Sequence, residues 1–69
     1  MNLFQLLRLV SSNIPLVILD INGQELVRVF SKDDLTTELY DYQVFEINGI
    51  IHAEFFRSKI PALLISIVK

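Results

Sequence analysis

The sequence contains no cysteine, no tryptophan and only one histidine among its 69 residues. Without cysteine, the chain can form neither a disulfide framework nor a thiolate zinc site. A single histidine also falls well short of the three or four ligands that a structural metal requires. Because small domains usually depend on disulfides, metals or a partner chain, these absences leave association with a partner as the simplest support.

Glycine and long apolar runs are also scarce. The only two glycines, Gly23 and Gly49, follow asparagine in Asn-Gly pairs that are typical of turns, so no glycine-rich loop exists to bind phosphate. No serine lies in a Gly-x-Ser-x-Gly nucleophile motif. We therefore expect a protein that is not an enzyme and carries no cofactor or catalytic residue.

The chain has no segment that predicts a membrane span or a signal peptide. The apolar residues 60–68 number nine, about half of the roughly 20 that a transmembrane helix needs. The first residues lack a basic segment followed by a small-residue cleavage site. Together with the absence of cysteine, this favours the cytoplasm.

Charge and hydropathy point to contact with proteins rather than nucleic acid. The net charge of −2 and the pI near 5.1 disfavour a general nucleic-acid binder. Hydrophobic residues make up 52% of the chain and the mean hydropathy is +0.49. A domain of this size buries only about 60% of the surface of its unfolded chain, so part of the apolar material should lie at an interface. The simplest interface is that of a twofold homodimer.

Residues 60–68 predict a strand near the middle of a sheet. A strand with one wet face alternates apolar and polar residues, whereas this stretch is apolar in both registers. Its two sets of side chains are Ile60, Ala62, Leu64 and Val68 on one side and Leu63, Ile65 and Ile67 on the other.

Residues 2–10 predict a short helix, with Asn2 as the N-cap and Gln5 as its reciprocal partner in a capping box. Because a helix this short is unstable alone, its apolar stripe should pack on the sheet. The stripe consists of Leu3, Leu6, Leu7 and Val10.

Two Asn-Gly turns predict two hairpins. The first pairs residues 16–20 with residues 24–30 through a three-residue bulged loop, which sets Ile18 opposite Leu26. The second pairs residues 42–47 with residues 50–56 around Asn48-Gly49. We therefore predict a single α+β domain over residues 1–69, with an N-terminal helix on a mainly antiparallel sheet of about five strands. One or two helical turns near residues 32–39 should connect the hairpins.

Two charged groups are candidate partner-binding surfaces. An acidic group lies in and after the predicted helical turns, and the basic Arg57 and Lys59 follow the last aromatic pair. The acidic group is equally explained as a solvated surface favoured by the helix dipole. Its members are Asp33, Asp34, Glu38 and Asp41.

A nucleic-acid site is the alternative interpretation. Four basic residues could gather where the hairpins end, close to aromatic side chains on which bases would stack. The basic residues are Arg28, Lys32, Arg57 and Lys59, and the aromatic residues are Tyr40, Tyr42 and Phe56. His52 and Glu54, two residues apart on one strand face, would be the start of a metal site, but the spacing marks no third ligand. We predict no metal.

The chain also resembles a set of small accessory proteins encoded by phages and mobile elements of Gram-positive bacteria. The similarity lies in the leucine-rich residues 3–10, the Val-Ile-Leu-Asp-x-Asn-Gly turn at 17–23, the Leu-Tyr-Asp-Tyr-Gln-Val run at 39–44 and residues 55–63. It implies a compact α+β domain in the cytoplasm of a host cell, and it brings no catalytic residue. It further implies a role in binding, and in some cases blocking, a host factor.

Overall fold

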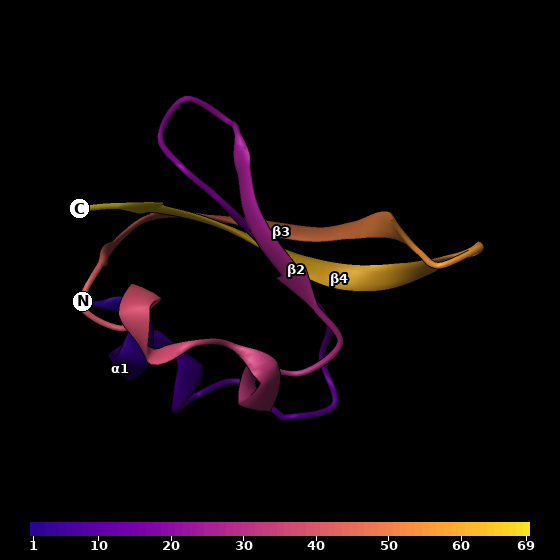
Figure 1. Ribbon diagram of the computed structural model, residues 1–69, viewed down its shortest axis with the longest axis horizontal. Coiled ribbons are helices and arrows are strands. Elements are labelled where there is room, and N and C mark those ends of the chain that lie inside the picture. Colours follow the sequence, from indigo (N-terminus) through magenta and orange to yellow (C-terminus); the bar gives the residue numbers. More distant parts are fainter.

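The computed structural model describes residues 1–69 as one short helix on a four-stranded sheet (Figure 1). This confirms the α+β class. Two 3-10 turns, η1 and η2, lie between the second and third strands. In chain order the elements are α1 (Leu3–Leu7), β1 (Leu16–Leu19), β2 (Glu25–Val29), η1 (Lys32–Asp34), η2 (Thr37–Leu39), β3 (Gln43–Phe55) and β4 (Ser58–Val68).

The strand order is β2-β1-β4-β3, and the sheet is mixed. β1 runs parallel to β4, while β1–β2 and β3–β4 are antiparallel. The C-terminal stretch therefore lies inside the sheet, as its two apolar faces predicted. Its side chains divide between two core clusters as expected: Ile65 belongs to one and Ala62 to the other.

The first core cluster lies beneath α1. The predicted capping box is present, because Asn2 Oδ1 accepts from Gln5 N–H and Asn2 N–H donates to Gln5 Oε1, each at 2.9 Å. The helix is shorter than predicted, and its leucine stripe packs on the sheet. The buried members of this cluster are Leu3, Leu6, Leu7, Leu16, Ile18, Leu35, Ile65 and Ile67.

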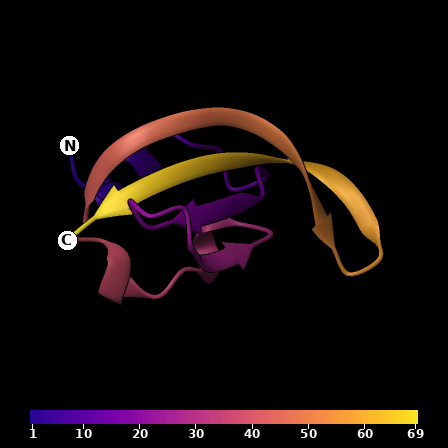
Figure 2. The same cartoon turned by 90° about the horizontal axis from the view of Figure 1, so that it is seen from above.

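The second face of the sheet is partly covered by the curled β3–β4 hairpin (Figure 2). Although β2 and β3 are the two sheet edges, the rings of Phe30 and Phe55 lie only 4.8 Å apart. The curl buries Val17 against Phe55 and two small residues, Ala53 and Ala62. Our expectation that only a second copy would close this face was therefore too simple, since the chain itself covers part of it.

The prediction of a second hairpin around Asn48-Gly49 is wrong. Residues 43–55 form one continuous strand, so the sheet has four strands rather than five. Asn48 is an extra residue in a bulge, where its Nδ2 donates to Ser66 Oγ at 2.9 Å and Gly49 takes a φ of +91°. The two-sided apolar β4 offers ladder partners to both halves of β3, which a local hairpin could not match. The chain reverses instead at Phe56-Arg57.

The loop of the first hairpin is confirmed, but its register is not. Asp20 N–H donates to Gln24 O at 2.9 Å across the three-residue loop. A further bulge at Leu26 sets Ile18 opposite Val27. This bulge turns Val27 toward the core and sends Arg28 outward, whereas the predicted register would have placed Leu26 inside.

Candidate functional site

The predicted acidic group lies on the two 3-10 turns and just after them. Ser31 caps η1 by accepting from Asp33 N–H, which favours carboxylates in its first turn. None of the acidic side chains forms an ion pair, and all are exposed. These residues, Asp33, Asp34, Glu38 and Asp41, border the same side of the sheet as α1 (Figure 1).

The basic residues Arg57 and Lys59 lie at the opposite end of the molecule, at the tip of the β3–β4 hairpin. Both views place this tip away from η1 and η2 (Figures 1 and 2). The acidic and basic candidates therefore form two separate surfaces rather than one.

An aromatic group assembles at the hairpin tip. The rings of Phe30 and Phe56 stack at 5.5 Å, and the guanidinium of Arg28 lies 5.5 Å from the centre of the Phe55 ring. Phe56 is 85% exposed and has a φ of 55°, a left-handed conformation that is uncommon outside glycine. The tip thus presents a flat apolar ring flanked by Arg57.

Arg28 is held in place from two sides. Its guanidinium donates to the carboxylate of Glu25 and to the carbonyl oxygen of Glu54. The hydrogen bond from Arg28 lowers the pKa of Glu25 below its ordinary value. The two sheet edges are thereby joined by one side chain, which contributes to the curl.

Three residues of the predicted nucleic-acid site are not part of this tip. Lys32 donates its Nζ to the carbonyl oxygen of Leu7 at 2.7 Å, on the α1 side of the sheet. Tyr40 and Tyr42 are half-buried against the core cluster beneath α1. The aromatic partners at the tip are instead Phe30, Phe55 and Phe56, which the predicted strand ends located only in part.

His52 and Glu54 are both exposed on β3, opposite Pro61 and Lys59 of β4. Nowhere in the structure do three His, Asp or Glu side chains come together in a group able to hold a metal ion.

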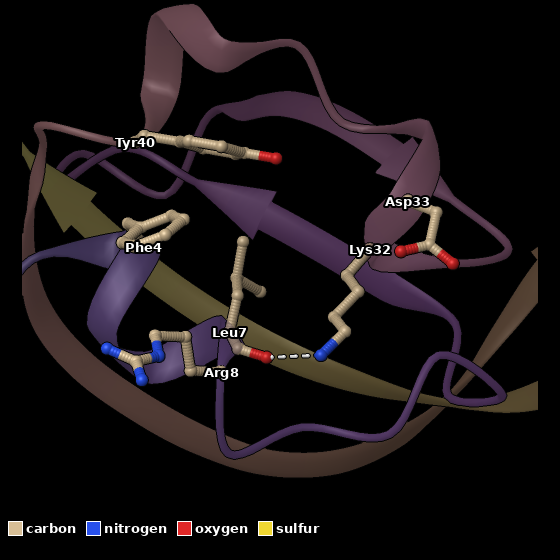
Figure 3. Close-up of a pocket in the computed structure, with 6 residues that line it drawn as sticks. All are labelled: Phe4, Leu7, Arg8, Lys32, Asp33 and Tyr40. Atoms are coloured by element: carbon tan, nitrogen blue, oxygen red, sulfur yellow. Dashed lines mark hydrogen bonds between the residues drawn. The ribbon is translucent and has the colours of Figure 1, made fainter.

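The sequence did not reveal a cavity of about 180 Å³ between α1 and the 3-10 turns (Figure 3). The rings of Phe4 and Tyr40 pack at 5.3 Å with a 41° tilt along one side. The six lining residues are Phe4, Leu7, Arg8, Lys32, Asp33 and Tyr40. No spacing rule joins positions 4–8 with 32–40, so only the docking of α1 on the 3-10 turns brings them together.

A second, more apolar cavity of about 460 Å³ lies beside β3. None of its lining residues is charged, and they come from the segment before β1 and from the β3–β4 hairpin. They are Asn13, Ile14, Pro15, Ile50, Ile60 and Pro61.

The outer edge of β3 is covered at both ends and free in the middle. Val44 N–H donates to Met1 O at 2.9 Å at one end, and Arg28 binds the carbonyl of Glu54 at the other. The intervening residues 45–53 pair with β4 alone. We call this stretch the free edge. It carries three well-exposed large apolar side chains: Phe45, Ile47 and Ile50.

Comparison of the chain with protein-family models, with curated proteins and with solved structures gave no match. No helix of this protein has the length and apolar character needed to cross a membrane.

Proposed function

We propose that this protein is a non-enzymatic interaction protein that forms a twofold homodimer through the free edge of β3. The observation that carries the proposal is the run of exposed apolar side chains on an edge strand whose two ends are already covered. Exposed, apolar strand edges are templates for association, and natural proteins usually protect them. The total accessible surface, 4596 Å², is close to the roughly 4500 Å² typical of a compact 8.0 kDa monomer. The exposed apolar surface therefore reflects which residues lie outside rather than a loose fold.

The occupant of the free edge is a second copy of this chain. In a twofold contact the same strand lies antiparallel to itself. When this contact is centred on Gly49, Glu46 of each copy lies opposite His52 of the other, whereas a shift of the centre to Ile50 would set Glu46 against Glu54. Charge complementarity thus selects one arrangement. Because β3 bulges at Phe45 and at Asn48, the contact is made mainly by side chains, with Ile50 reaching the apolar cavity beside it.

Light scattering after size exclusion tests the dimer. We expect a mass of twice 8.0 kDa for the wild type and a monomer for Ile50→Glu, because the introduced carboxylate would be buried unpaired. Ile21→Glu is the matched control, since Ile21 is 55% exposed and Ile50 is 59% exposed, but Ile21 lies in the first hairpin loop. A wild type that stays monomeric at several hundred micromolar would refute the proposal, as would equal masses for the two variants.

The wider role that we propose is that of a cytoplasmic accessory protein of a phage or mobile element, which binds and blocks a host protein. The resemblance in the sequence motivates this role. Of the two charged surfaces, the hairpin tip is the better candidate, because exposed aromatic and arginine side chains are enriched in binding hot spots. Phe56 and Arg57 are adjacent there, whereas the acidic group at 33–41 contains no exposed aromatic residue. Affinity capture from host lysate with wild type and Phe56→Ala tests it; a partner retained equally by both proteins would exclude the tip.

The hairpin tip also supports a second candidate function, the binding of single-stranded nucleic acid. The observation in its favour is the exposed Phe56 ring, on which a base could stack, between Phe30 and the cationic Arg57. A gel-shift experiment at low and moderate salt tests it. Retardation that weakens with salt and disappears in Arg57→Gln would support this function, and no retardation at low salt would remove it.

A further inference from the structure

We infer that the cavity between α1 and the 3-10 turns binds a small aromatic carboxylate. The inference is independent of the dimer, because none of the cavity residues belongs to the free edge. It depends on three properties of the cavity: its unused hydrogen-bond donors, its net charge and its aromatic wall.

The cavity holds more donors than the protein uses. Lys32 Nζ spends one of its three donors on Leu7 O, and the Arg8 side chain has no hydrogen bond or ion pair within the protein. The hydroxyl of Tyr40 points into the cavity (Figure 3) and has no partner within the protein. An ammonium, a guanidinium and a phenol that converge on one space are the groups that bind an oxyanion.

The charge of the cavity favours a monoanion. Arg8 and Lys32 supply two positive charges, and Asp33, which also lines the cavity, supplies one negative charge. The sum of +1 is balanced by one carboxylate, whereas a phosphate dianion would leave negative charge beside Asp33. A carboxylate is also planar and matches the guanidinium fork of Arg8.

The walls and the size select the rest of the ligand. Phe4 and Tyr40 form a tilted aromatic pair, and the Leu7 side chain lies between the two cations (Figure 3). A volume of about 180 Å³ accommodates a single ring with a short acidic arm. An aryl group packed on Phe4 and Tyr40 would place its carboxylate toward Lys32 and Arg8.

Titration with phenylacetate, followed by amide chemical shifts, tests the inference. We expect saturable shifts at Phe4, Leu7 and Tyr40, and binding of the neutral phenylacetamide that is weaker by about tenfold, because a charge-assisted hydrogen bond is lost. Acetate, which has the charge but no ring, should also bind more weakly. The absence of saturable shifts, or equal affinity for the acid and the amide, would overturn the inference.

Two arginine variants separate the cavity from general charge effects. Arg8→Gln should weaken phenylacetate binding about fivefold to tenfold and leave the fold intact, because Arg8 is exposed and its side chain makes no bond within the protein. Arg57→Gln removes an equal charge at the distant hairpin tip and should leave the affinity unchanged. Equal weakening in both variants would show non-specific attraction and would also overturn the inference.

Discussion

Lys32 is expected to hold α1 to the 3-10 turns, and its replacement by methionine measures how strongly. Its Nζ donates to the carbonyl oxygen of Leu7 at 2.7 Å in a half-buried position. This carbonyl lies in the last turn of α1, where a cation is also favoured by the helix dipole. Lys32→Met keeps the apolar stem and removes only the charge and its donors.

The magnitude follows from the partners that remain. A hydrogen bond to a charged group contributes about 1.5 to 3 kcal/mol. Leu7 O keeps a second donor, Val10 N–H at 3.2 Å, so the carbonyl is not left unpaired and the lower part of this range applies, about 1 to 2 kcal/mol. A chain of 69 residues has a total stability of about 3 to 10 kcal/mol, so the loss is a sizeable share.

Urea and thermal denaturation followed by circular dichroism provide the assay. We expect Lys32→Met to lower Tm by about 4 to 8 °C per kcal/mol lost. Lys59→Met is the matched control, because Lys59 is exposed at the hairpin tip and forms no hydrogen bond or ion pair, so its loss should change stability by less than about 0.5 kcal/mol. All proteins are compared at one concentration, since self-association would itself raise Tm. Equal midpoints for the two variants would refute the role assigned to Lys32.

Three further substitutions test other parts of the fold. Ile18→Ala should cost about 2 to 5 kcal/mol and unfold a large fraction of the protein at 37 °C, because Ile18 is fully buried in the core beneath α1; urea unfolding checks this. Gly49→Ala should cost about 1 kcal/mol through its φ of +91° alone, since a Cβ there meets nothing within 4 Å; Gly23→Ala, at +83° and equally open, should cost a similar amount, and unchanged midpoints would contradict the strain argument. Glu25→Gln should destabilise slightly at pH 7, because the folded-state pKa of Glu25 is lowered by Arg28. That contribution is present above the unfolded value of 4.5 and is lost as the pH falls through the folded value, so the two melting curves should converge in acid.

The sequence predicted the elements whose signals are local. The Asn2–Gln5 capping box, the leucine stripe and the Asp20–Gln24 loop closure each depend on residues within a few positions of one another, and each is confirmed. The central position of the last strand was also predictable, because its lack of a polar face requires cover on both sides.

The errors arose where a distant strand decided between two local options. Asn48-Gly49 suits a hairpin turn and a bulge equally well, and only the ladder with β4 selects the bulge. The same holds at Leu26, where one extra residue moves Val27 into the core. Turn chemistry specifies the backbone angles, but it does not specify which strand the flanking residues pair with.

The candidate sites were predictable as residues but not as groups. Arg57 and Lys59 were recognised as exposed bases, yet their proximity to Phe30 depends on the curl of the hairpin. The cavity of Arg8 and Lys32 had no signal at all, because it joins two segments that are distant in sequence.

The parallel contact between β1 and β4 has a consequence for how the chain folds during synthesis. Residues 16–19 pair with residues 63–66, so the second strand of the sheet to be completed is the last one made. Until β4 has left the ribosome, β1 lacks its inner neighbour, β3 has no partner strand, and α1 has no complete surface to cover. Folding should therefore be delayed until synthesis is almost finished, and ribosome-bound chains that lack β4 should remain sensitive to protease.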